Sequence, residues 1–164
     1  MTTNNIAYLL TGSNMGNRED NLNRAKALIE QYIGKIIMAS HFYETQAWGK
    51  TGQPNFYNQA LAVQTPQYPQ VVLKNIFKIE ELMGRVRSEK WADRVIDIDI
   101  LLFNEDIVEQ DDLKIPHPHL HERNFALVPL MEVAGEVIHP ILNMAIEDVY
   151  FECVDTLDVI IIEE

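Results

Sequence analysis

The alternation of hydrophobic and polar residues predicts strands and helices in regular succession along the chain. Short apolar or alternating runs are typical of strands, and apolar residues three or four positions apart are typical of helices. We therefore expect the order βαββαββα, followed by a tail that contains one more strand. The predicted elements span residues 6–10, 17–32, 35–44, 55–64, 69–83, 95–103, 107–108, 124–134 and 159–162.

The first six elements have the order βαββαβ, which is typical of a ferredoxin-like unit. The sequence therefore predicts an α/β (α+β) fold, in which helices pack in layers on a largely antiparallel sheet. Gly34 and Gly84 are expected to end the first two helices. Pro69 is expected to begin the second helix and Asn124 to cap the third. We expect residues 1–164 to form a single domain, because no linker, repeat or low-complexity segment interrupts them.

The charge balance limits the kinds of partner. The formal net charge is −12, from 13 basic and 25 acidic residues. Such a chain repels nucleic acid, so we expect no nucleic-acid partner. Four of the basic residues nevertheless gather in one loop, at Arg85, Arg87, Lys90 and Arg94. This basic loop, defined here as residues 84–94, indicates a small anionic ligand.

Composition also predicts the compartment. No apolar run approaches the ~18 residues that a membrane span needs, so we expect no membrane partner. Residues 1–5 are uncharged and mostly polar, which is not typical of a signal peptide. The single cysteine, Cys153, excludes an intramolecular disulfide and fits a reducing compartment. We therefore expect a cytoplasmic protein.

Asp97 and Asp99 lie two positions apart in the clearest predicted strand, so their side chains point to the same face, about 6.5–7 Å apart. Two such carboxylates repel each other unless water or a cation neutralises them. Magnesium fits because it binds one or two carboxylates together with phosphate oxygens and water. The alternative is a half-exposed strand with a solvated polar face. The predicted faces are Val95, Asp97, Asp99, Leu101 and Phe103 on one side, and Ile96, Ile98, Ile100 and Leu102 on the other.

The basic loop leads directly into this strand. Arg85 and Arg87 carry guanidinium groups that fork onto phosphate oxygens, and Trp91 offers a stacking surface. The alternative is a solvated loop, or one paired with the many acidic side chains. Cations for phosphate beside carboxylates for a metal are what ATP with Mg²⁺ requires, so the combination favours phosphate transfer.

Three histidines alternate at positions 117, 119 and 121. A zinc site is the less favoured interpretation, because Pro118 disrupts a regular strand and no cysteine is near. A histidine and an arginine that contact phosphate fit better. Residues 45–54, which contain two glycines and a proline, are a candidate mobile lid.

The motifs exclude some nucleotide enzymes. The chain has neither a phosphate-binding G-x-x-x-x-G-K-[ST] loop nor the protein-kinase motifs. A nucleotidyltransferase remains an alternative, although Ser13 and Asp97 are further apart than its two motifs usually lie. A non-catalytic ferredoxin-like binding module is the other alternative.

Taken together and in order, the motifs resemble those of the 6-hydroxymethyl-7,8-dihydropterin pyrophosphokinase family of folate biosynthesis. The matching positions are residues 12–14, 42–45, 53–58, 80, 84–87, 91, 94, 97–101, 116–118, 123 and 125. The resemblance implies an enzyme that transfers pyrophosphate from the co-substrate ATP to the hydroxymethyl group of the pterin and releases AMP. It also favours a monomer.

The resemblance implies roles for individual residues. Two Mg²⁺ ions would bind Asp97 and Asp99, and Arg85 and Arg94 would complete the catalytic set. The implied nucleotide site consists of Glu80, Arg87, Lys90, Trp91, Arg94, His117, Arg123 and the backbone near Ile100. The implied pterin site consists of Thr45, Gln46, Trp48, Phe56, Asn58, Asp97 and Phe125, with the pterin stacked between the two phenylalanines. The chain departs from the family at Asp93, Lys90 and Trp48, where proline, arginine and a proline-containing lid are usual.

Overall fold

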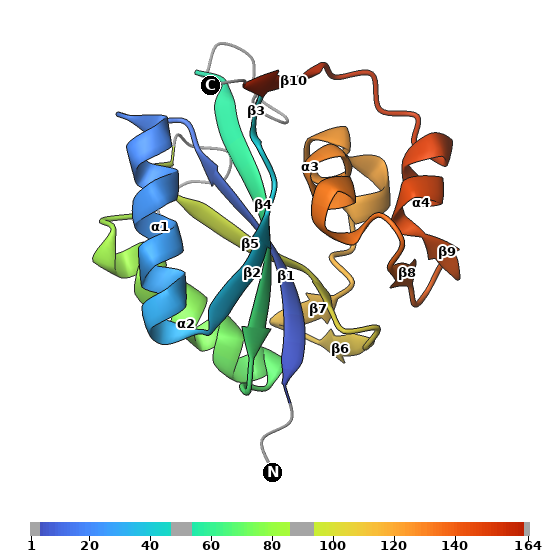
Figure 1. The fold of residues 1–164 in the computed structure, drawn as a ribbon, viewed down its shortest axis with the longest axis horizontal. Helices are drawn as coiled ribbons and strands as arrows, with labels where there is room; N and C mark the ends of the chain where they lie inside the picture. The colour runs from blue at the N-terminus through green and yellow to red at the C-terminus, as the bar shows by residue number, and fades with distance from the viewer. Residues whose placement is uncertain (1–3, 47–53, 86–93, 163–164) are drawn as a thin grey trace.

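The computed structural model describes residues 4–46, 54–85 and 94–162. Figure 1 shows the elements in chain order. They are β1 (Asn5–Ser13), α1 (Arg18–Tyr32), β2 (Lys35–Ala39), β3 (Phe42–Thr45), β4 (Phe56–Thr65), α2 (Pro69–Leu82), β5 (Asp97–Phe103), β6 (Val108–Gln110), β7 (Leu113–Ile115), a 3₁₀ turn (Leu120–Glu122), α3 (Asn124–Ala134), β8 (Ile138–His139), β9 (Met144–Ala145), α4 (Ile146–Glu152) and β10 (Val159–Ile162).

The main sheet has the strand order β10-β3-β4-β1-β5, and β2 also pairs with β4. All of these pairings are antiparallel. Strand β1 therefore lies between β4 and β5, with β2 and β3 beyond β4. This order confirms the predicted ferredoxin-like α+β fold.

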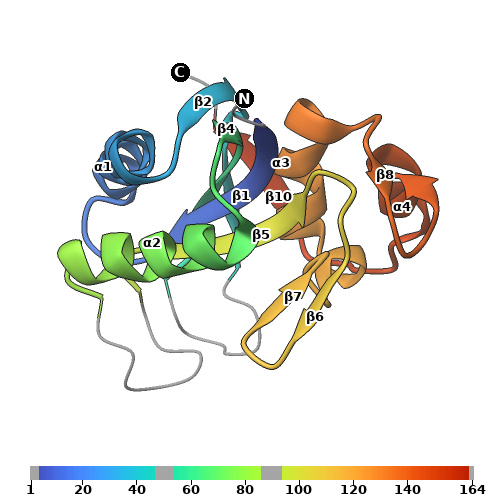
Figure 2. The ribbon, with the colours of Figure 1, turned by 90° about the horizontal axis from the view of Figure 1, so that it is seen from below.

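The helices form a layer on each face of the sheet. Figures 1 and 2 show α1 and α2 on one face and α3 and α4 on the other. On the first face, Ile29 and Ile76 pack into a core with Leu9. On the second, Leu127 packs into a separate core with Ala60. No helix in the part of the chain that the structure describes is long and apolar enough to cross a membrane.

The single strand predicted over residues 35–44 is wrong, because it is two strands, β2 and β3. Both pair with β4, and Ser40 lies at the break between them. The Ser40 hydroxyl accepts a hydrogen bond from the Ala60 N–H (2.9 Å), while the Ser40 N–H donates to the Ala60 carbonyl (2.9 Å). The Ser40 hydroxyl thus replaces a backbone carbonyl as the acceptor for the Ala60 N–H. The ladder between the strands is interrupted at Ser40, but that N–H is still paired.

The predicted alternation of β5 holds from Ile96 to Leu101 and then fails. Leu9 pairs with Ile100, whereas Tyr8 pairs with Leu102, so Leu101 is an extra residue in the ladder. Such a bulge reverses every later side chain. Leu102 consequently packs toward α3 and Phe103 toward α1 and α2, opposite to the prediction. Val95, which precedes the strand, also packs on the α1 and α2 side.

Two local predictions need correction. The strand predicted at residues 107–108 begins at Val108 as β6 and pairs with β7, a strand that was not predicted. The residue that caps α3 is Arg123 rather than Asn124, and it provides no side-chain hydrogen bond to the helix. Gly84 ends α2 with a φ of 84°, as expected of a terminal glycine. Gly34 also follows the end of α1 as predicted, without a positive φ; a Cβ there would clash with the Gln64 carbonyl oxygen of β4.

Candidate active site

Two pockets meet above the first half of β5. The aromatic pocket is lined by Leu10, Gly12, Thr45, Gln46, Phe56, Asn58, Arg94, Asp97, Asp99, Arg123 and Phe125. The charged pocket adjoins the aromatic pocket, and its lining includes Glu80, Arg85, Ile100, Lys114 and His117. Arg94, Asp97, Asp99 and Arg123 line both. A ligand in one pocket therefore meets a ligand in the other at the acid pair.

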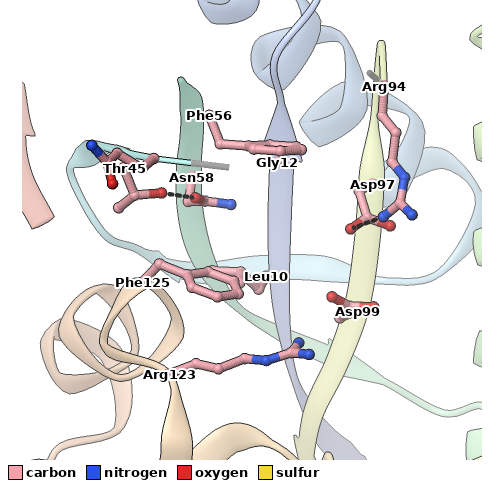
Figure 3. A pocket seen from close by; sticks show the side chains of 11 residues that line it. Leu10, Gly12, Thr45, Phe56, Asn58, Arg94, Asp97, Asp99, Arg123 and Phe125 are labelled. Carbon is pink, nitrogen blue, oxygen red and sulfur yellow. Dashed lines mark hydrogen bonds and ion pairs between the residues drawn. The ribbon is translucent and has the colours of Figure 1, made fainter. Parts of the chain in front are cut away.

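The acid pair has unequal surroundings. Asp97 forms ion pairs with Nη1 of Arg85 (2.9 Å) and Nη1 of Arg94 (3.1 Å). Burial and the Asp97 charge raise the pKa of Asp99 to about 8, although the nearby Arg123 opposes the shift. Figure 3 shows the Arg123 side chain reaching toward Asp99 from the start of α3. Ionising both Asp97 and Asp99 therefore costs free energy in this site, and a bound cation would lower that cost.

Glu80 anchors one side of this cluster. Its buried carboxylate, on α2, lies 2.6 Å from Nη1 of Arg85 and accepts a hydrogen bond from the Ile98 N–H of β5 (2.9 Å). Only 1% of Glu80 is exposed. The family resemblance implied a place for Glu80 in the nucleotide site; in the structure it lines the charged pocket and contacts both Arg85 and β5.

Asn14 is a positioning residue that sequence reasoning did not single out. Its N–H donates to the Arg94 carbonyl (3.0 Å), and its Oδ1 accepts from the Arg94 N–H (2.6 Å). Its Nδ2 also donates to the Pro54 carbonyl (3.3 Å). One buried side chain therefore fixes the start of β5 and the start of the segment that leads into β4. The sequence offered one signal for Asn14, which is its position directly after Gly12 and Ser13 at the end of a strand.

The aromatic pocket is a slot with a polar edge. Figure 3 shows the rings of Phe56 and Phe125 on either side of Asn58. Asn58 is oriented by two hydrogen bonds: its Oδ1 accepts from the Thr45 hydroxyl (3.3 Å), and its Nδ2 donates to the Thr11 carbonyl (3.3 Å). An amide fixed between two rings suits a flat, polar-edged heterocycle.

His117 is held as a neutral donor on the rim of the charged pocket. The backbone N–H of His117 donates to the Leu101 carbonyl (3.0 Å), and the ring Nδ1 accepts from the backbone N–H of His119 (3.1 Å). Burial, together with the Arg123 charge, lowers the pKa of His117 to about 4. Because Nδ1 accepts, the proton of the neutral ring sits on Nε2, where it is available to a phosphate oxygen.

His117→Gln should lose less stability on acidification than the wild type. The unfolded chain binds this proton near pH 6.5 and the folded chain only near pH 4, so the free energy of unfolding falls as pH falls between these values. The expected difference between about pH 7 and pH 5 is on the order of 1 kcal/mol. Urea unfolding at both pH values measures it, with His121→Gln, at an exposed position outside both pockets, as the control. Equal losses in the two variants would contradict the assignment.

The remaining predicted residues divide into three groups. His119 and His121 are exposed and lie near Glu122, and no group of three possible ligands occurs among the described residues, so the zinc interpretation gains no support. Ile100 packs into the core and also lines the charged pocket. Trp48, Arg87, Lys90 and Trp91, and the unusual Asp93, lie outside the described residues.

The fold and the two joined pockets define an enzyme of the phosphate-transferring class. Residues 8–135 match the family model described as 7,8-dihydro-6-hydroxymethylpterin-pyrophosphokinase, and the chain belongs to this family. The resemblance seen in the motifs is thereby confirmed.

Curated relatives agree with this assignment. The chain is 40% identical over 141 residues to the 2-amino-4-hydroxy-6-hydroxymethyldihydropteridine pyrophosphokinase of Aquifex aeolicus, covering 86% of this chain and 88% of that one. It is 41% identical over 135 residues to the Bacillus subtilis enzyme of the same name, covering 82% and 81%.

Solved structures support the fold. The HPPK-DHPS of Plasmodium falciparum with pterin and p-hydroxybenzoate superposes with a TM-score of 0.72 at 22% identity. The match covers 93% of this chain and 43% of the Plasmodium chain, so this chain spans less than half of that protein. At this identity the likeness bears on architecture alone.

Proposed function

We propose that the chain transfers the pyrophosphate group of ATP to the hydroxymethyl group of 6-hydroxymethyl-7,8-dihydropterin and releases AMP, in folate biosynthesis. The observation that carries this proposal is the meeting of the two pockets at Asp97 and Asp99. An acceptor in the aromatic pocket would reach a nucleotide in the charged pocket only there. Placing two reactants in contact in this way is a large part of catalysis.

The reaction exchanges one phosphorus–oxygen bond for another. The hydroxymethyl oxygen of the pterin attacks the β-phosphorus of ATP, and the bond from that phosphorus to the α–β bridging oxygen breaks. AMP leaves with the bridging oxygen, and the hydroxyl proton passes to solvent. The protein supplies position and positive charge, because phosphoryl transfer needs little else from it.

The residues fit two Mg²⁺ ions. Asp97 and Asp99 provide the oxygen ligands that magnesium prefers, and burial and the Asp97 charge raise the pKa of Asp99 more than the nearby arginines lower it. With only these two carboxylates, coordination would be completed by phosphate oxygens and water. When bound, the ions would neutralise charge on the α- and β-phosphates.

The arginines would change partners when the substrates bind. Both Arg85 and Arg94 pair with Asp97 in the structure. With Mg²⁺ held at the acid pair, the guanidinium groups of Arg85 and Arg94 would be available to phosphate oxygens, which they bind in the same forked geometry as a carboxylate. The Nε2–H of His117 and the Arg123 guanidinium would add further donors. Roles for Arg87, Lys90 and Trp91 on the nucleotide remain predictions.

The pterin would lie between Phe56 and Phe125, with Asn58 and the Thr45 backbone reading its polar edge. Gln46 lines the same pocket, and the proposed cover by Trp48 remains a prediction. We also propose a cytoplasmic location, which the lone Cys153 fits.

Gly12→Ala should weaken pterin binding selectively. A Cβ at Gly12 would lie 2.6 Å from Nδ2 of Asn58, so the Asn58 amide must shift, and 3.4 Å from Cδ1 of Phe56, which is close van der Waals contact. We expect the pterin KM to rise about 10-fold or more and stability to fall by about 1–3 kcal/mol, as for other overpacked sites. Steady-state kinetics with each substrate varied tests this. Gly12 does not line the charged pocket, so an equal rise in the ATP KM would contradict it.

The proposed reaction is tested by its products. The protein is incubated with ATP, Mg²⁺ and the hydroxymethyl-dihydropterin, and AMP that depends on the pterin is the expected product. The 6-methyl-7,8-dihydropterin is the matched control, because it keeps the ring but lacks the attacking oxygen. ADP would indicate an ordinary kinase, pyrophosphate a nucleotidyltransferase, and no product a binding module.

A further inference from the structure

The start of α3 carries two side chains of the proposed pterin pocket, Arg123 and Phe125. A helix start leaves several backbone N–H groups without helical partners, and a capping side chain normally satisfies one of them. Arg123 occupies the capping position and supplies no such hydrogen bond. The acceptor that holds the start of α3 in place must therefore come from another segment of the chain.

Asp155, in the tail after α4, supplies the missing acceptor. Its Oδ2 accepts from the Asn124 N–H (2.9 Å), and its backbone carbonyl accepts from Nδ2 of Asn124 (3.0 Å). Its other oxygen, Oδ1, accepts from the Leu157 N–H (3.0 Å), which fixes the carboxylate within the tail. A negative charge at a helix N-terminus also interacts favourably with the helix dipole.

The same tail then reaches the other wall of the pocket. Strand β10 pairs with β3, and Val159 lies opposite Thr45, the residue that orients Asn58. Figure 1 shows the chain crossing from α4 to this edge of the sheet. Only three residues separate Asp155 from Val159, so one short segment joins the helix that bears Phe125 to the strand that bears Thr45.

The tail contributes little to the core. Val154 is 92% exposed and Ile160 is 57% exposed, so its contacts are chiefly hydrogen bonds. It also lies beyond the residues that the family model matches, which end at 135. We propose that Asp155 is a positioning residue for pterin binding: it caps α3 from outside the helix and so sets Arg123 and Phe125 against the wall formed by Thr45 and Asn58. This inference rests on the proposed function.

The test is the affinity for the pterin, measured by fluorescence titration with Mg²⁺ and an ATP analogue whose α–β bridging oxygen is replaced by a methylene group, so that binding is observed without turnover in either order of substrate binding. Asp155→Ala should raise the pterin Kd about 5- to 30-fold, the factor that corresponds to losing one capping interaction. Asp155→Asn keeps an acceptor oxygen and should recover most of the affinity. Asp158→Ala removes a nearby exposed acid and should bind as the wild type does.

A general loss of stability is distinguished by a second control. Ile29→Val trims a buried side chain on the opposite face of the sheet, and should lower the melting temperature without changing the pterin Kd. The proposal is overturned if Asp155→Ala binds the pterin as tightly as the wild type, if Asp155→Asn recovers nothing, or if Ile29→Val weakens binding equally. Absence of pterin binding by the wild type would instead overturn the proposed function.

Discussion

Asp99→Asn is expected to abolish pterin-dependent AMP release and, in the absence of Mg²⁺, to make the protein more stable at about pH 8. The loss of activity should reach at least ~10³-fold, because a bound metal ion is worth several kcal/mol of transition-state stabilisation. The gain in stability arises because asparagine cannot ionise beside Asp97. Losing function while gaining stability separates a metal site from a structural one.

The direction of the pH dependence follows from the raised pKa of Asp99. An unfolded aspartate loses its proton near pH 3.8, whereas the folded protein holds this one to about pH 8. Between these values the folded state binds more protons, so the free energy of unfolding decreases as pH rises. Asp99→Asn removes this contribution, and its advantage over the wild type should therefore grow from about pH 4 to about pH 8.

Denaturant unfolding across this range, with EDTA and then with Mg²⁺ and ATP, measures the effect. Added Mg²⁺ and ATP should stabilise the wild type and leave Asp99→Asn unchanged. Asp97→Asn is the matched comparison: it should be equally inactive, but it also removes the negative charge that pairs with Arg85 and Arg94 and replaces one of their two acceptor oxygens by an NH₂ group. Activity of Asp99→Asn within tenfold of the wild type would rule out the metal assignment.

The parts of the fold that were predictable depend on local pattern. Helix α1 and helix α2 begin where Asn17 and Pro69 indicate, and the face of β5 that carries Asp97 and Asp99 follows from a period of two. The order of the elements then gave the sheet topology. The acid pair was correctly placed because it precedes the bulge at Leu101.

The remainder depends on contacts between distant residues. Nothing near Ser40 in the sequence reveals that its hydroxyl replaces a backbone acceptor for Ala60 of β4. Asn14 and Arg94 are 80 positions apart, and Asp155 caps a helix that begins 31 residues earlier. Polar residues of this kind resemble ordinary turn residues until the fold brings their partners to them.

Arg94→Ala should lower kcat by roughly 10²–10⁴-fold if the guanidinium stabilises charge in the transition state. The fold should tolerate the change, because Asn14 holds the backbone of residue 94 through two hydrogen bonds that do not involve the Arg94 side chain. The pair lost, with Asp97, is partly exposed, and such pairs contribute about 0–1 kcal/mol. We therefore expect a large kinetic effect with a small change in melting temperature.

Arg18→Ala provides the matched control for this loss. Arg18 pairs with Glu44 at 2.9 Å, its side chain is 28% exposed against 24% for Arg94, and it lines neither pocket. Removing it should leave kcat near that of the wild type. Arg94→Lys should recover only part of the rate, because an ammonium group offers a point charge where the guanidinium forks between two oxygens. If Arg94→Ala lowered the melting temperature and left kcat unchanged, the charge of Arg94 would serve only to hold Asp97, and stabilisation of the transferring group would fall to Arg85, His117 and Arg123.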